Sequence, residues 1–166
     1  MEIELKTYPI QLLTSHYMIT GSITPRGNPS IFLNDPRLDV YEINSATFNP
    51  LEAGTPVATI TVPTAYVPRG KTQVIILGDY TVDEAQPMPK TEVMAVFTDT
   101  YLVHGHYHMA QEVTGSDLFF VQKGPMYPVT RAEIYTLRPI REPIGGEADL
   151  LYINGELVES FYLEEA

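Results

Sequence analysis

The chain has 166 residues, of which 44% are hydrophobic and 19% are charged, which is the composition of a globular protein. No apolar run approaches the roughly 20 residues that cross a bilayer, and the acidic, alternating amino terminus differs from a secretory signal. The 10 Lys and Arg against 21 Asp and Glu give a net charge of -11, which disfavours binding to nucleic acid. The chain has no Cys, so disulfides and thiolate metal sites are excluded. We expect a cytoplasmic protein that does not bind membranes.

Two blocks of the chain recur later in the same order. With a shift of 84 residues, Ile10–Gly21 lies over Met94–Gly105, and a Thr, a Tyr and a Gly coincide. With a shift of 86 residues, Val40–Leu51 lies over Met126–Leu137, and a Tyr, an Ala and a Leu coincide. Drifting offsets are typical of a duplication, because loops tolerate insertions better than strands do.

The closing segments of the two copies also correspond. Residues 57–67 lie over 148–158 with a shift of 90 or 91, and residues 74–77 lie over 160–163. The sequence therefore predicts a first unit at residues 1–79 and a second unit at residues 92–166. Residues 80–91 are polar, contain two prolines and have no counterpart, so they are predicted to form a linker.

Both copies show alternation of apolar and polar residues with a period of two, together with many β-branched and aromatic residues. Turn signals such as PRGNP, EAGTP and PIGG separate these runs. No helix is expected, and the 14 prolines spread along the chain argue against helices of ordinary length. The chain is predicted to be all-β, with about five strands in each unit.

Each unit has a Gly, Gly21 or Gly105, in the middle of its long second strand, where a strand can bend sharply. Five strands with such a bend favour a small, strongly bent β-barrel. The bent strand, the third strand and the closing strands correspond to the segments TSHYMITGSI, DVYEINSATF and ATITVPTAYV in the first copy, and YLVHGHYHM and LLYINGELV represent the bent and closing strands in the second. This pattern resembles the Sm-like fold, which has a bent strand with Gly, a third strand opened by Asp and a closing pair of strands.

The resemblance implies two tandem Sm-like barrels, and the unit is also similar to domains of bacterial proteins without an assigned activity. The RNA-binding activity of the Sm-like family is not expected here. Where the family has an Arg-Gly turn, the chain has Val62–Ala65 in the first copy and Ile153–Glu156 in the second. The Arg that contacts RNA is therefore missing from both copies.

A short match to a phosphate-binding loop ends in Gly70, Lys71 and Thr72. Such a loop must lead into a helix, whose first amides bind the phosphates. Here the match is followed by Gln73 and the β-type run of residues 74–77, which predicts a hairpin turn instead.

Three of the four histidines, His104, His106 and His108, alternate along one predicted strand and therefore share one face. Neighbouring members are ~7 Å apart along a strand, so His104 and His106 could hold one divalent metal ion together with a ligand from a second strand. His104 and His108 are ~13 Å apart by the same geometry, so all three cannot share one ion. Glu112 and Asp117 are the carboxylates considered as partners. The alternative is a solvated face whose charge changes near the ordinary His pKa of about 6.5.

No Cys nucleophile and no Gly-x-Ser-x-Gly motif is present, and no catalytic or cofactor-binding residue is predicted. The tyrosines that recur in both copies, Tyr17, Tyr41, Tyr101 and Tyr127, are predicted to be core or barrel-rim residues and not stacking platforms for nucleic acid. We predict a non-enzymatic protein-interaction or assembly module, whose edge strands or shared groove bind a protein partner or further copies. A metal-binding protein, catalytic or not, that uses His104, His106 and His108 is the alternative. An Sm-like nucleic-acid binder is the third and disfavoured hypothesis.

Overall fold

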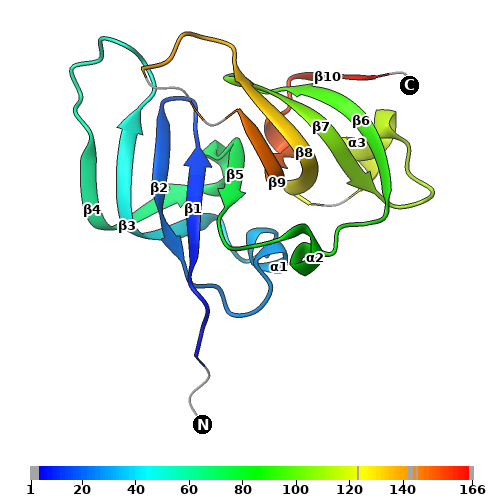
Figure 1. The fold of residues 1–166 in the computed structure, drawn as a ribbon, viewed down its shortest axis with the longest axis horizontal. Coiled ribbons are helices and arrows are strands. Elements are labelled where there is room, and N and C mark those ends of the chain that lie inside the picture. Colours follow the sequence, from blue (N-terminus) through cyan, green and yellow to red (C-terminus); the bar gives the residue numbers. More distant parts are fainter. Residues whose placement is uncertain (1–3, 123, 142–143, 145, 165–166) are drawn as a thin grey trace.

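The computed structural model describes residues 4–122, 124–141, 144 and 146–164. Within these residues the chain forms ten strands: β1 (Tyr8–Leu13), β2 (Tyr17–Ile23), β3 (Val40–Pro50), β4 (Ile60–Pro68), β5 (Val74–Leu77), β6 (Lys90–Phe97), β7 (Tyr101–Met109), β8 (Met126–Thr136), β9 (Glu147–Asn154) and β10 (Ser160–Leu163). They form one antiparallel sheet in the order β10-β6-β7-β8-β9-β5-β1-β2-β3-β4 (Figure 1). The predicted all-β class is confirmed.

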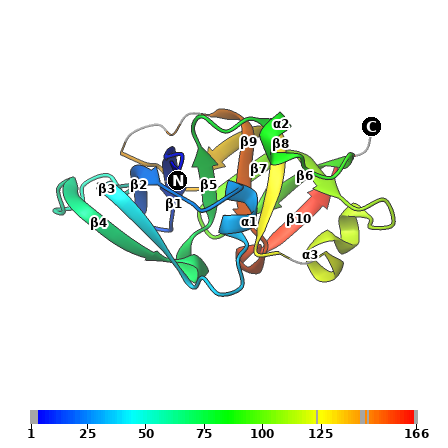
Figure 2. The same ribbon diagram turned by 90° about the horizontal axis from the view of Figure 1, so that it is seen from below.

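The sheet is not closed into barrels, so that part of the prediction is wrong. The free side of β5 pairs with β9, and β4 and β10 are left at the two ends of the sheet. These end strands lie at opposite ends of the molecule in both views (Figures 1 and 2). A barrel would need β4 to pair with β5 in its own half, but β5 is taken by the second half of the chain.

The first half, β1 to β5, and the second half, β6 to β10, have the same strand order: last, first, second, third, fourth. The second strand of each half has a register shift at its glycine, Gly21 or Gly105, as expected for a bend at that point. Opposite each bend, the third strand has a residue in the left-handed region, Ser45 with φ 50° and Arg131 with φ 49°. These two residues are separated by 86 positions, the same shift that relates the third strands in the sequence.

The register of the closing strands differs from the sequence prediction. Tyr41 pairs with Val67 in the first half, and Tyr127 pairs with Ile153 in the second. Val67 therefore corresponds to Ile153, with a shift of 86 positions instead of 90 or 91. The shift of 90 differs from 86 by four positions, and this even displacement preserves the alternation of apolar and polar residues. Alternation alone could therefore not distinguish these two registers, whereas the shift of 91 differs by an odd number.

Three single-turn α-helices were not predicted: α1 (Pro29–Leu33), α2 (Val82–Ala85) and α3 (Leu118–Val121). The side chain of Asn28 caps α1 by accepting from the N–H of Ser30, and Thr81 and Glu84 form a capping box on α2. One turn is too short to show a helical period, so the caps were the only signals in the sequence. None of the described helices is long and apolar enough to cross a membrane.

The remaining turns include three 3₁₀ turns in the described residues: η1 (Arg69–Lys71), η2 (Gly115–Asp117) and η3 (Gly155–Leu157). The Gly-Lys-Thr match lies in η1 and at its C-cap Thr72 and leads into the strand β5, not into a helix. The predicted hairpin turn is wrong, because β4 and β5, the strands on either side of it, do not pair with each other. The predicted linker, residues 80–91, contains α2 and the start of β6. Its Tyr80 is buried against the first half, with its hydroxyl hydrogen-bonded to Ser30.

Each half has its own apolar core, and each core includes side chains from the other half. The first core, around Ile10, Ile43 and Val67, also contains Met126, Leu150 and Tyr152. The second core, around Tyr101, Val103 and Ile153, also contains Leu13, Leu51 and Val74. The β5–β9 pair thus lies where two cores meet, and the halves are joined by apolar packing as well as by strand pairing.

Candidate functional site

The face of β7 that carries the three histidines is the less buried one, as the alternation predicted. His104 Nε2 lies 2.7 Å from Glu164 Oε2, and the backbone N–H of Glu164 donates to the carbonyl of Val93 on β6. His104 is therefore engaged with the segment that follows β10.

His108 is buried, with an exposed fraction of 8%, and both of its ring nitrogens are hydrogen-bonded. Nδ1 donates to the carbonyl of Met88, and Nε2 accepts from the hydroxyl of Thr130, both at 2.7 Å. Burial lowers the pKa of His108, the nearby His106 lowers it further, and the bond to Met88 opposes the change. The structure thus gives His108 a packing role as a neutral imidazole.

In the part of the chain that the structure describes, the side chains near the three histidines do not form a set of metal ligands. No group of three or more His, Asp or Glu within the described parts of the chain is close enough to hold a metal ion. The Asp117 carboxylate accepts from Thr114 in the turn at η2, and Glu112 lies in the exposed turn after β7. A metal ion held by His104 and His106 stays a prediction that would need ligands from another molecule or a rearrangement of these turns.

The neutral state of His108 gives a testable pH dependence. Its folded pKa lies below the unfolded value of about 6.5, so the unfolded chain binds more protons as the pH falls. The free energy of unfolding should therefore decrease as the pH falls from about 6.5 toward the folded pKa. In H108Q this decrease should be smaller, since the other histidines are common to both proteins. Urea unfolding at pH 5 to 8 measures it, and parallel pH profiles would contradict the assignment.

The junction between the halves is short and specific. Val74 and Ile75 on β5 pair with Ile153 and Tyr152 on β9. The pairing continues one residue further, where the N–H of Asn154 donates to the carbonyl of Gln73 at 2.9 Å.

A buried amide forms the polar centre of this junction. Gln73, with an exposed fraction of 3%, accepts from the Thr98 hydroxyl at 2.6 Å and from the Thr100 N–H at 3.3 Å. Its Nε2 donates to Ser15 Oγ at 2.8 Å and to Thr100 Oγ1 at 3.4 Å. Nearby, the Tyr101 hydroxyl donates to the carbonyl of Thr14 at 2.8 Å. The first half thus inserts one polar side chain into the second.

Asn154 closes the junction from the other side. This fully buried side chain donates to the carbonyls of Arg69 and Thr72, both at 3.0 Å, and accepts from the N–H of Glu156. The turn η1 of the first half is thereby tied to the end of β9.

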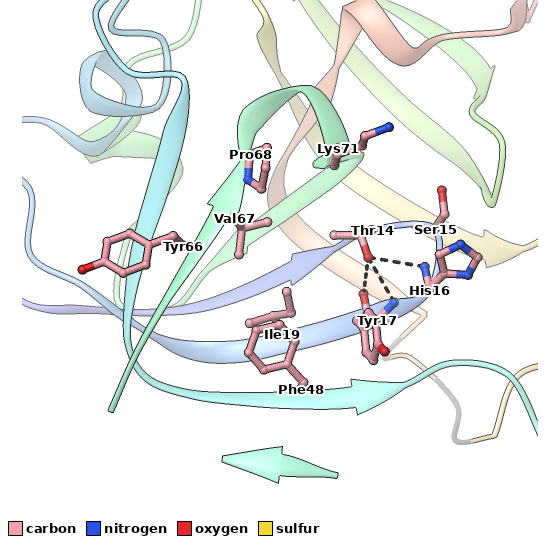
Figure 3. Close-up of a pocket in the computed structure, with 10 residues that line it drawn as sticks. All are labelled: Thr14, Ser15, His16, Tyr17, Ile19, Phe48, Tyr66, Val67, Pro68 and Lys71. Carbon is pink, nitrogen blue, oxygen red and sulfur yellow. Dashed lines mark hydrogen bonds between the residues drawn. The ribbon is translucent and has the colours of Figure 1, made fainter. Parts of the chain in front are cut away.

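The first half has an open groove of about 360 Å³ beside β4, with a mainly apolar floor (Figure 3). Tyr17 and Phe48 pack edge to face at 5.8 Å between ring centroids, and Thr14 at one end bonds to the backbone of Tyr17 and His16. Lys71 and the largely exposed Tyr66 lie at the rim. The lining residues are Thr14, Ser15, His16, Tyr17, Ile19, Phe48, Tyr66, Val67, Pro68 and Lys71.

This groove corresponds in position to the surface of the second half that the junction covers. Tyr17 matches Tyr101 by the 84-residue shift, and Val67 matches Ile153 by the 86-residue shift. Tyr101 is fully buried because the first half covers it, whereas Tyr17 is only half-buried. Of the recurring tyrosines, Tyr41, Tyr101 and Tyr127 lie in the core as predicted, and Tyr17 lines the groove.

The groove and the junction were missed by sequence reasoning, which did not single out Gln73 or Asn154. The available signal was that Thr14 and Tyr17 recur as Thr98 and Tyr101, but recurrence does not show which copy is covered. Comparisons with protein-family models, with curated proteins and with solved structures found no match. The contacts of the junction and the groove are therefore what supports a function.

Proposed function

We propose that this protein is a non-enzymatic assembly module, built from two copies of one five-stranded unit that resembles the Sm-like fold. Its two halves are joined by pairing β5 with β9, and further copies of the chain are joined by pairing β10 with β4. Protein is then the partner, and the proposed function needs no cofactor.

One observation supports this proposal most directly. The chain contains one complete junction, the β5–β9 pair, and its two end strands correspond to the two strands of that junction. β5 is the last strand of its half and β9 is the fourth strand of its half. The corresponding strands at the ends of the sheet are β10 and β4, which have no further strand beside them in the part of the chain that the structure describes. A contact between two different surfaces of this kind can be repeated from copy to copy, giving a ring or a filament.

The second junction should be weaker than the first. Asn154 is replaced at the matching position by Pro68, which has no N–H and no side chain that can donate. The backbone bond to Gln73 and the two side-chain bonds made by Asn154 therefore have no counterpart on β4. We expect reversible association that depends on concentration, in contrast to the fixed internal junction.

The alternative functions have less support. An RNA-binding function lacks both the family's Arg and a positive surface, since the net charge is -11. A metal site would have to form from His104 and His106, because His108 is already hydrogen-bonded on both ring nitrogens.

The proposal is tested by changing a single backbone donor on β4. The backbone N–H of Arg69 donates to the carbonyl of Asp39, just before β3, so the N–H of Arg69 points toward β3. In an antiparallel pair the direction of the N–H alternates from residue to residue, so the N–H of Tyr66, three residues earlier, points away from β3 toward the open edge. Y66P removes this donor without removing a β3–β4 hydrogen bond, and Pro is tolerated at such edge positions. We expect Y66P to raise the dissociation constant for self-association about tenfold relative to Y66A, measured by sedimentation velocity over a concentration series.

The matched control is Y66A, which also lacks the ring but keeps the N–H. Equal dissociation constants for Y66P and Y66A would show that β4 is not the paired edge. A wild-type protein that stays monomeric up to a concentration of about 1 mM would contradict the assembly function as a whole.

A further inference from the structure

Glu159 occupies the same place in the second half as Gln73 occupies in the first. The N–H of Gln73 donates to the carbonyl of Leu13 at 2.8 Å, and the N–H of Glu159 donates to the carbonyl of Phe97 at 2.8 Å. These donors are 86 positions apart and their acceptors are 84 apart, in agreement with the shifts of the corresponding strands. Gln73 is buried in the internal junction, whereas Glu159 is exposed at the edge of β10.

The surface of the second half that binds Gln73 has a counterpart in the groove of the first half. Thr98 and Thr100, which bind the Gln73 amide, match Thr14 and His16. Thr14 Oγ1 accepts from the N–H of Tyr17 at 3.1 Å, as Thr98 Oγ1 does from Tyr101. The turn is therefore preformed, and the Thr14 hydroxyl and the His16 N–H lie at the matching positions (Figure 3). Within the turn, the His16 N–H donates to Thr14 Oγ1 at 3.3 Å and the Thr14 hydroxyl donates to the carbonyl of Tyr17 at 3.3 Å, so a bound carboxylate would replace these two long bonds.

The residues that differ between the two sites differ in charge. Where the internal junction has the neutral Gln73, the free edge of β10 has Glu159. Where the internal junction has Thr100, the groove has His16, and the groove also contains Lys71 at its rim. The neutral contact inside the chain is thus matched by an acidic side chain at the edge of β10 and by a Lys at the rim of the groove.

We infer, resting on the proposed assembly function, that the groove takes the Glu159 carboxylate of a second copy. The carboxylate accepts from the Thr14 hydroxyl and the His16 N–H, as the Gln73 oxygen accepts from Thr98 and Thr100 in the internal junction, and Lys71 at the rim supplies positive charge. This contact gives the assembly a direction. Pairing β10 with another β10 would bring two Glu159 side chains together, and like charges in an interface are strongly unfavourable.

Other charged groups beside this contact already have partners of opposite charge. Asp99 matches Ser15, which contacts Gln73 in the internal junction, and Asp99 Oδ2 lies 3.7 Å from Arg138 Nη2. Glu52 Oε1 lies 3.7 Å from His16 Nδ1 and 3.9 Å from Arg138 Nη1. The negative charges of Asp99 and Glu52 weaken the electrostatic attraction between the groove and Glu159. Arg138 lies close to both carboxylates and offsets part of their negative charge.

A charge exchange tests the inference. E159K and H16E should each raise the dissociation constant for self-association about tenfold or more, because each places like charges in the contact. The double variant E159K/H16E should recover most of the wild-type affinity, since the exchanged side chains again carry opposite charges across the contact. Sedimentation velocity at one fixed pH and ionic strength gives the constants, and D83K, an exposed change on α2 of equal charge, should leave them unaltered.

The outcomes separate the inference from the function on which it rests. If the wild type associates but E159K and H16E leave its dissociation constant within about twofold, the inference is wrong and the assembly function stands. A double variant as weak as the single variants would also overturn it. If the wild type does not associate up to about 1 mM, both fail. Far-ultraviolet circular dichroism checks that these exposed substitutions leave the fold intact.

Discussion

Replacing Gly21 by alanine is expected to lower the free energy of unfolding by about 3 kcal/mol. A Cβ at this position would lie 2.6 Å from the carbonyl oxygen of Asn44 and 2.6 Å from Cγ2 of Ile43. The first of these atoms belongs to the backbone of β3, so relief requires the pairing of β2 with β3 to shift. Because β3 pairs with β4, the strain should extend to the groove. Urea unfolding followed by circular dichroism measures the loss.

The matched control is G70A, because a Cβ at Gly70 in η1 would meet no atom within 4 Å. It should stay within about 0.5 kcal/mol of the wild type. G105A is expected to be destabilised as well, with Cβ distances of 2.8 Å to Val129 Cγ1 and 3.0 Å to the carbonyl oxygen of Thr130. If G21A were as stable as G70A, this would contradict the close approach of β2 and β3 at the bend.

The central glycines illustrate what a sequence with an internal match can predict. Gly21 and Gly105 recur at a fixed place in a long strand, and the only common physical reason is a local bend, which the register shifts bear out. Recurrence also identified Tyr41, Tyr101 and Tyr127 as core residues. Predictions succeeded where the same local requirement acts on both copies.

Predictions failed where the two halves meet. The sequence does not show that β5 pairs with β9, because pairing between strands that are far apart in the chain leaves no local pattern. Closed barrels were expected because, without a sign of the β5–β9 pair, the last strand of each half was free to pair with the fourth strand of the same half. The groove was missed for the same reason, since Tyr17 and Tyr101 are alike in sequence and differ only in what covers them. His108 looked like a ligand because its partners, Met88 and Thr130, are distant in the chain.

In the assembly that we propose, the internal junction holds the two halves of one chain together and further copies associate reversibly. Its strand pairing spans only three residues of each strand, so polar side chains must contribute much of its specificity. Gln73 and Asn154 are both buried and bind groups from the opposite half. At the free edges, Glu159 beside β10 occupies the position that matches Gln73, and Pro68 on β4 occupies the position that matches Asn154. The junction inside the chain is therefore suited to permanent burial, and the exposed edges are suited to contact with water before assembly.

Replacing Asn154 by alanine is expected to destabilise the protein by about 3 kcal/mol, because the buried carbonyl of Thr72 would lose its side-chain donor and the N–H of Glu156 would lose its acceptor. The carbonyl of Arg69 would lose one of two donors and keep the N–H of Thr72. Each orphaned buried acceptor costs about 1–3 kcal/mol, and the small alanine leaves a space that water cannot fill without partners. The matching change on the open edge, P68A, removes no hydrogen bond and should alter stability by less than about 0.5 kcal/mol. Urea unfolding of the two variants at one pH gives the comparison. Equal stability of N154A and P68A would show that Asn154 does not hold the halves together.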